Sequence, residues 1–148
     1  MALKIERFIP LIQVFDMPRA IAFYRDVLGF EVVSQSTQGN DFDWGMLRLK
    51  DTLLMLNTAY ETENRPAAPE LARVAAHKDT ALFFDCPDPN AAYEYLRALD
   101  IDVRAPVITG YGMKQVYVSD PDGYQLCFQC TAVEQGAADG QSGASSLK

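Results

Sequence analysis

The sequence of 148 residues contains a single histidine, His77, and this scarcity excludes several classes of site. An iron centre of the two-histidine, one-carboxylate type needs two imidazoles, so the chain cannot supply one by itself. The three cysteines, Cys86, Cys127 and Cys130, are an odd number and too few for a disulfide framework. The sequence therefore points away from histidine-rich metal enzymes and from small disulfide-stabilised proteins.

Positive charge is scarce as well, with 13 Lys and Arg against 20 Asp and Glu and a net charge of −7. Nucleic-acid binding requires a basic face, so we expect no nucleic-acid partner. Apolar runs such as 53–56 are too short to span a bilayer, so we expect no membrane insertion. The first residues lack the apolar segment and cleavage site of a signal peptide, and a cytoplasmic location is expected.

The sequence contains an internal repeat, in which one structural unit occurs twice. Asp16 ends an apolar run and is expected to cap a helix that has Pro18 in its first turn and ends at Gly29. Asp88, 72 positions later, opens a second helix that reaches Leu99. We expect strands at 8–15, 30–36, 43–49 and 52–57 in the first copy and at 80–86, 100–104, 113–118 and 123–129 in the second. Both copies therefore follow the order strand, helix and three strands.

These two copies define the expected domain organisation. A single domain, 1–130, contains the modules 7–58 and 79–130, which are joined by the linker 59–78. The linker is rich in Pro, Ala and Glu, and one short helix is expected at 69–76. The last residues, 131–148, have little to bury and are expected to form a flexible tail. Short links after each helix favour hairpins, which predicts an α+β fold with mostly antiparallel pairing.

Two stretches carry a family resemblance, namely LIQVFDMPRAIAFYRDVLGFEVV (11–33) and QVYVSDPDGYQLCFQ (115–129). They resemble the two halves of the vicinal oxygen chelate superfamily, which includes glyoxalases, extradiol dioxygenases and bleomycin-resistance proteins. The resemblance implies paired βαβββ modules that form a U-shaped sheet around a ligand cleft, usually in a homodimer. It leaves the function open, because this scaffold supports both enzymes and plain binding proteins.

The resemblance also implies where a metal would be held, on the first and last strand of each module. Those positions here are Ile9, Met55, Ala81 and Cys127. Isoleucine and alanine cannot ligate a metal, a thioether is a soft donor, and one thiolate alone does not hold zinc. We therefore expect neither the usual metal nor another cofactor.

Three further features have plain structural interpretations. Cys127 and Cys130 are three apart on an expected strand and so point to opposite faces, which predicts buried structural thiols rather than a redox or zinc pair. The residues 120–123, Asp-Pro-Asp-Gly, predict a type I turn that closes a hairpin. His77 is interpreted as a solvated linker residue, because no orienting partner is identifiable.

Alternation along the strands predicts a pocket for an organic ligand on the face that holds the metal in related proteins. The alternative is that these side chains pack a closed core. The candidate ligand-binding residues are Gln13, Trp44, Met55, Asn57, Phe83, Asp85, Tyr111, Met113, Gln125 and Cys127.

The leading hypothesis is a small-molecule-binding protein of the bleomycin-resistance type, which sequesters an organic ligand without catalysis. The resemblance implies that this branch binds a cationic drug and confers antibiotic resistance, and the net charge of −7 is compatible with such a ligand. The alternative is a glyoxalase-like lyase or isomerase that uses Cys127, Asp85 or His77 in place of a metal.

Overall fold

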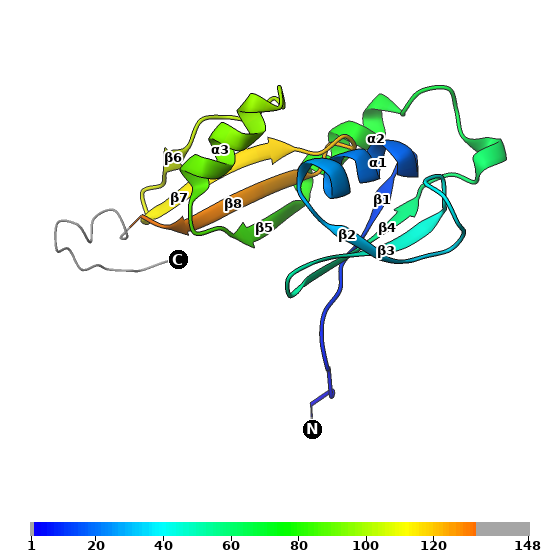
Figure 1. Cartoon of the computed structure of the whole chain (residues 1–148), viewed down its shortest axis with the longest axis horizontal. Helices are drawn as coiled ribbons and strands as arrows, with labels where there is room; N and C mark the ends of the chain where they lie inside the picture. The colour runs from blue at the N-terminus through cyan, green and yellow to red at the C-terminus, as the bar shows by residue number, and fades with distance from the viewer. Residues whose placement is uncertain (1, 133–148) are drawn as a thin grey trace. The chain divides into compact units, whose positions relative to one another are not determined.

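A computed structural model describes residues 2–132 of the chain (Figure 1). The chain divides into two compact units between Glu70 and Leu71, inside the expected linker. Each unit contains one βαβββ module, and each is described by itself below.

The first module forms a four-stranded sheet in the order β1-β4-β3-β2. Strands β1 and β4 pair in parallel, whereas β4 with β3 and β3 with β2 pair antiparallel. Its elements are β1 (Leu11–Val14), α1 (Met17–Ile21), the π-helical turn η1 (Ala22–Val27), β2 (Glu31–Gln35), β3 (Trp44–Leu49) and β4 (Thr52–Thr58), and the 3-10 turn η2 (Thr62–Asn64) follows.

The second module repeats this arrangement in the order β5-β8-β7-β6, again with its first and last strands parallel. It is preceded by α2 (Leu71–Ala76) and the 3-10 turn η3 (His77–Asp79). Its own elements are β5 (Ala81–Asp85), α3 (Pro89–Ala98), β6 (Val107–Ile108), β7 (Met113–Ser119) and β8 (Gln125–Thr131). The expected α+β class, the two βαβββ modules and the mostly antiparallel pairing are confirmed.

Both module helices begin at the aspartates that the sequence indicates. The Asp16 carboxylate accepts a hydrogen bond from the Arg19 amide at 2.9 Å, and the Asp88 carboxylate accepts one from the Ala91 amide at 3.1 Å. These caps satisfy amides that have no partner inside the helix. The helix expected between Asp16 and Gly29 is present, and its second half, Ala22–Val27, is π-helical.

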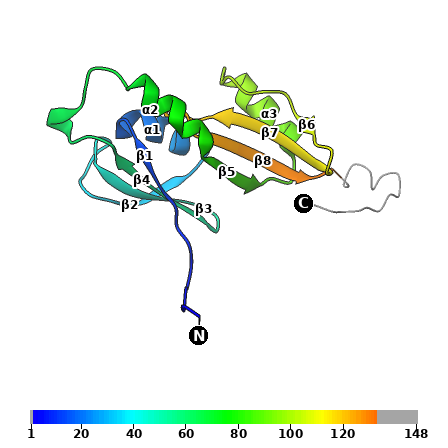
Figure 2. The same cartoon turned by 180° about the vertical axis from the view of Figure 1, so that it is seen from behind.

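In each module the helix, α1 with η1 or α3, covers one face of the sheet. The core of the module lies between this helix and the sheet (Figures 1 and 2). In the first module the buried side chains include Ile12, Val14, Met17, Ala20, Ile21, Tyr24, Leu47, Leu54 and Leu56. In the second module they include Leu96, Val116, Val118 and Leu126. Burial of these apolar side chains is the main stabilising contribution in each module.

The strand expected at 100–104 was wrong. Only Val103 forms an isolated bridge there, with Val118, and the edge strand β6 begins later, at Val107. Asp100 adopts a positive φ of 61°, which extended strands do not permit, and Pro106 has no amide hydrogen to donate to a strand. The second module therefore has a shorter edge strand than the first.

Residues 2–10, before β1, contain no regular secondary structure and extend away from the first module's sheet (Figures 1 and 2). Leu3, Ile5 and Phe8 are largely exposed in this segment. No helix within residues 2–132 is long and apolar enough to cross a membrane. The flexible tail expected at 131–148 lies almost entirely outside the described residues, and Thr131 still belongs to β8.

The predicted turn at 120–123 joins β7 to β8, and helix α2 packs closely against it. The Gly123 amide donates to the Asp120 carbonyl at 3.1 Å, and the Asp120 carboxylate accepts from the amides of Asp122 and Tyr124. Gly123 has a φ of +93°, and a Cβ added to it would collide with the carbonyl oxygen of Val74. Glycine is thus required here both by conformation and by space.

We expect Gly123→Ala to lower the free energy of unfolding by about 3 kcal/mol, because it adds overpacking to a strained φ. Gly29→Ala is the matched control, since Gly29 has a φ of +94° but nothing within 4 Å of an added Cβ. Gly29→Ala should lower the free energy of unfolding by only about 1–2 kcal/mol. Urea unfolding of both variants checks this, and equal losses would show that the contact with Val74 does not matter.

Candidate functional site

The side chains on the helix-free face of each sheet, here called the open face, form the candidate site. In the first module, β1, β4 and β3 place Gln13, Asn57 and Trp44 side by side in one row. The Asn57 amide donates to the Gln13 side-chain oxygen at 3.4 Å. The next row along the same strands consists of Leu11, Met55 and Met46. A polar row therefore lies beside an apolar one.

The second module builds the same pair of rows on its open face. Its apolar row joins Phe83, Cys127 and Tyr117, and the rings of Phe83 and Tyr117 meet edge to face with centroids 6.2 Å apart. Its polar row consists of Asp85, Gln129 and Gln115, in which the Gln115 amide donates to the Gln129 side-chain oxygen at 2.9 Å. Phe83 is 51% exposed.

The structure thus groups most of the predicted binding residues on the open faces, in two sets. Gln13, Trp44, Met55 and Asn57 share one sheet, and Phe83, Asp85, Gln125 and Cys127 share the other. Met113 lies at the start of β7, opposite Thr131. Tyr111 lies in the turn before β7, where its hydroxyl accepts a 3.5 Å hydrogen bond from Gln115. That these residues bind a ligand remains a prediction.

Strand β7 contributes site residues that the sequence reasoning missed. Tyr117 and Ser119 alternate with the buried Val116 and Val118 and so face the open side, and Gln115, itself buried, belongs to the polar row through its pairing with Gln129. Alternation from Met113 along β7 was the signal that could have found them. Arg104 was missed as well, because it lies outside any regular strand and reaches the face only through the fold.

The positions implied for metal ligands do not fit a metal. Ile9 offers no donor atom and Ala81 only a methyl group, while Met55 and Cys127 lie among apolar neighbours on the last strands. Within residues 2–132, no group of three or more His, Cys, Asp or Glu side chains is arranged to hold a metal ion. A hard divalent ion requires carboxylate or imidazole donors, and the open faces do not gather such a set.

The cysteine pair in the CxxC spacing lies on one strand, β8. Cys127 faces the open side in the apolar row but is 0% exposed, whereas Cys130 is partly exposed. Burial raises the pKa of the Cys127 thiol, and a hydrogen bond with Tyr117 only partly opposes this. The thiol is therefore protonated at neutral pH, which disfavours a role as nucleophile.

The interpretation of His77 as a solvated residue was wrong. Its ring stacks on Tyr124 with centroids 4.1 Å apart, and Nδ1 lies 2.7 Å from the Asp122 carbonyl oxygen. Nε2 lies 3.2 Å from the Tyr124 hydroxyl. Both ring nitrogens are thus engaged, one with the turn 120–123 and one with Tyr124 just before β8, which gives His77 a structural role in fixing the linker.

Two modules with these open faces define a scaffold of the vicinal oxygen chelate type, and the sequence comparison agrees. The family model described as the Glyoxalase/Bleomycin resistance protein/Dioxygenase superfamily matches residues 4–128. The chain belongs to this superfamily. No curated protein matches it in sequence.

Solved structures show the same fold at low sequence identity. SMU.1112c superposes with a TM-score of 0.68 at 26% identity, covering 86% of this chain and 100% of that one. A bleomycin resistance determinant encoded on the transposon Tn5 superposes with a TM-score of 0.64 at 21% identity, covering 86% of this chain and 98% of that one. A bleomycin-binding protein from Streptomyces verticillus, solved with copper(II)-bleomycin, superposes with a TM-score of 0.59 at 20% identity, covering 86% of this chain and 97% of that one.

We expect Cys127 to resist modification by a thiol reagent such as DTNB in the folded protein, because it is buried and protonated. Cys86 and Cys130, which are partly exposed, should react first. The third thiol should react only after denaturant is added, and Cys127→Ala should remove that slow phase alone. Three equally fast thiols in the native wild-type protein would contradict the buried position of Cys127.

Proposed function

We propose that this protein binds a small organic molecule on the open faces of its sheets, as a non-catalytic binding protein of the bleomycin-resistance type. The observation that carries the proposal is the apolar row beside a polar row in each module, with Phe83 half exposed beside Tyr117. An apolar floor with a few fixed amides is typical of sites that bind organic ligands.

The comparisons support this proposal through the scaffold. Both the Tn5 determinant and the Streptomyces verticillus protein are described by their relation to bleomycin, and both share this fold. At 21% and 20% identity the likeness concerns the fold alone. Bleomycin is therefore a reasonable first probe, and sequestration of such a compound, leading to antibiotic resistance, is part of the proposal.

The same geometry favours binding over the alternative lyase or isomerase. The Cys127 thiol is buried and its pKa is raised, and His77 is engaged by the turn and Tyr124. Asp85 is exposed, and both ring nitrogens of His77 are already engaged, so neither side chain is placed as a general base would be. We propose accordingly that the site works without a metal and without a cofactor.

We also propose that the protein is a homodimer, as the family resemblance implies. The exposed Leu3, Ile5 and Phe8 in the segment before β1 support an association of chains, because exposed apolar side chains close together often mark an interface.

Metal analysis tests the proposal directly. After dialysis against zinc, nickel or manganese and removal of free ion, we expect far less than one metal per chain, because Ile9 and Ala81 occupy the positions where the family resemblance implies ligands. Glyoxalase-type turnover should stay at background with each metal. Stoichiometric metal, or turnover stimulated by metal, would refute the metal-free site.

Ligand binding is tested with bleomycin, its copper(II) complex and a panel of aromatic metabolites, by thermal shift and titration. For any compound that raises the melting temperature, we expect Phe83→Ala to weaken binding about tenfold, because an exposed ring is lost from the apolar row. Tyr95→Ala is the matched control, since Tyr95 is 52% exposed but lies on helix α3.

Tyr95→Ala should change the affinity less than about twofold, and both variants should unfold near the wild-type temperature because both rings are exposed. Equal weakening by the two variants would place the ligand elsewhere than the open face. Failure of the whole panel to stabilise the protein would count against the proposed function itself.

A further inference from the structure

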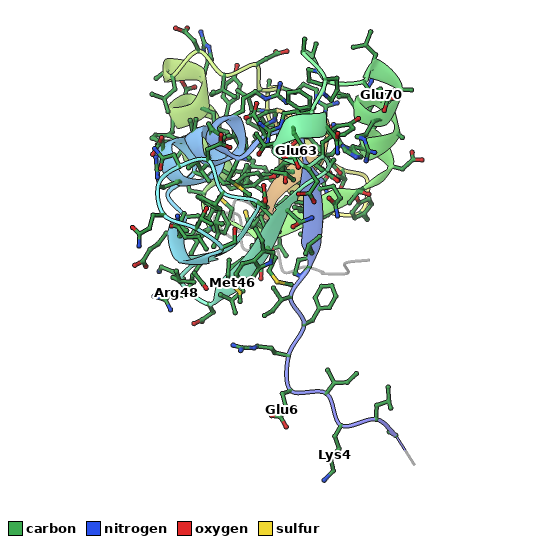
Figure 3. All side chains as sticks on the ribbon, turned by 90° about the vertical axis from the view of Figure 1, so that its right-hand side faces the viewer. Lys4, Glu6, Met46, Arg48, Glu63 and Glu70 are labelled. Atoms are coloured by element: carbon green, nitrogen blue, oxygen red, sulfur yellow. The ribbon has the colours of Figure 1, made fainter. Side chains whose placement is uncertain are left out.

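Each module has a surface depression at the same place in the repeat. The first, of about 380 Å³, is lined by Arg7, Val33, Met46, Arg48 and Leu53, together with Lys50 and Asp51. Figure 3 shows Met46 and Arg48 projecting from β3 on the same side. The second depression, of about 400 Å³, is lined by Lys78, Asp102, Arg104, Tyr117, Ser119 and Gln125 among others.

The correspondence between the two depressions follows the internal repeat. Met46 and Tyr117 lie opposite the equivalent residues Met55 and Cys127 on the last strands. Arg48 pairs with Leu53 as Ser119 pairs with Gln125. Val33 precedes Arg104 by 71 positions, as Met46 precedes Tyr117, and Arg7 and Lys78 each lie a few residues before the first strand of their module. The depressions are therefore the same site of the module, occurring once in each copy.

Both depressions gather positive charge in a chain whose net charge is −7. In the second, Lys78 and Arg104 face a single carboxylate, Asp102. Within residues 2–132, neither Lys78 nor Arg104 has a carboxylate within the 4.0 Å of an ion pair. In the first, Arg48 is already paired with Glu31 at 3.3 Å. Among the described residues, Arg7 and Lys50 of the first depression likewise have no carboxylate within that distance, so both depressions hold cations outside any ion pair. The second depression differs in how its arginine is held.

The guanidinium of Arg104 is held in place by its neighbours. Its Cζ lies 5.2 Å from the centroid of the Tyr117 ring, and Nη2 donates to the Gln125 side-chain oxygen at 3.2 Å. The Gln125 amide nitrogen in turn donates to Ser119 Oγ at 2.8 Å and to the Gly123 carbonyl at 3.2 Å, which orients its oxygen toward Arg104. Arginine has five N–H donors, so most stay available to an acceptor in the depression.

We propose that the depression of the second module binds the acidic group of an organic anion, such as an aromatic carboxylate. Arg104 receives the carboxylate, Lys78 adds a second positive charge, and Tyr117 contacts the apolar body. This inference rests on the proposed function and assigns a charge class to its ligand. The expected ligand of this depression is thus an anion rather than the cationic drug that the family resemblance implies. Fixed cations close to a ligand outweigh the net negative charge of the chain, which is distant and screened.

The test uses three probes that share one ring and differ in charge: phenylacetate, 2-phenylethylamine and 2-phenylethanol. Binding at low ionic strength is followed by amide chemical shifts in NMR. We expect phenylacetate to shift Tyr117, Ser119 and Gln125 most strongly and to bind better than the amine or the alcohol. A preference for the amine or the alcohol at these residues would overturn the proposal.

Charge-neutralising variants identify the group that binds the anion. Arg104→Gln should weaken phenylacetate binding about tenfold, and Lys78→Gln about threefold. Arg97→Gln is the matched control, because it removes one positive charge from the exposed face of α3. It should change the affinity less than about twofold, and equal effects of Arg97→Gln and Arg104→Gln would overturn the proposal.

The outcomes separate this inference from the proposed function. Phenylacetate shifts confined to Phe83 and Gln129, unaffected by Arg104→Gln, would overturn the anion site while leaving binding on the open face intact. Absence of phenylacetate binding at Tyr117 and Gln125 would likewise overturn the anion site. The proposed function is tested separately, by the ligand panel and by the Phe83→Ala variant.

Discussion

The parallel pairing of the first and last strands within each module is the constraint on which the site depends. Leu11 lies opposite Met55, and Phe83 lies opposite Cys127, so both copies use the same alignment. Side chains alternate along a strand, and a slip of one residue would send the open-face row into the helix-covered core. Burial of the core residues holds this alignment, and the rows of the open face follow from it.

The open faces combine two different physical environments. Apolar side chains such as Phe83 and Met55 can exclude water from a ligand, and the amides of Gln13, Asn57, Gln115 and Gln129 provide directional hydrogen bonds. The proposed binding of an organic molecule rests on this combination. The local positive charge beside Tyr117 shows that a net charge describes the solubility of a chain and says little about one site.

Much of the fold could be predicted from local signals. The capping aspartates Asp16 and Asp88 fix where the helices begin, and the turn before Gly123 fixes a hairpin, because both act through the nearest few residues. The failures lie where distant residues compete with local preference. His77 stacks on Tyr124, which lies far along the chain. The strand expected at 100–104 is absent, because Asp100 adopts a positive φ.

The sequence by itself determined the repeat, the module helices and most strands, because each of these depends on residue type and spacing alone. Only the tertiary structure decided that Tyr117, Ser119 and Arg104 join Gln125 at one depression, and that His77 is a structural residue. The reason is physical: strand pairing brings together side chains that are far apart in sequence, and no local pattern encodes which of them will meet.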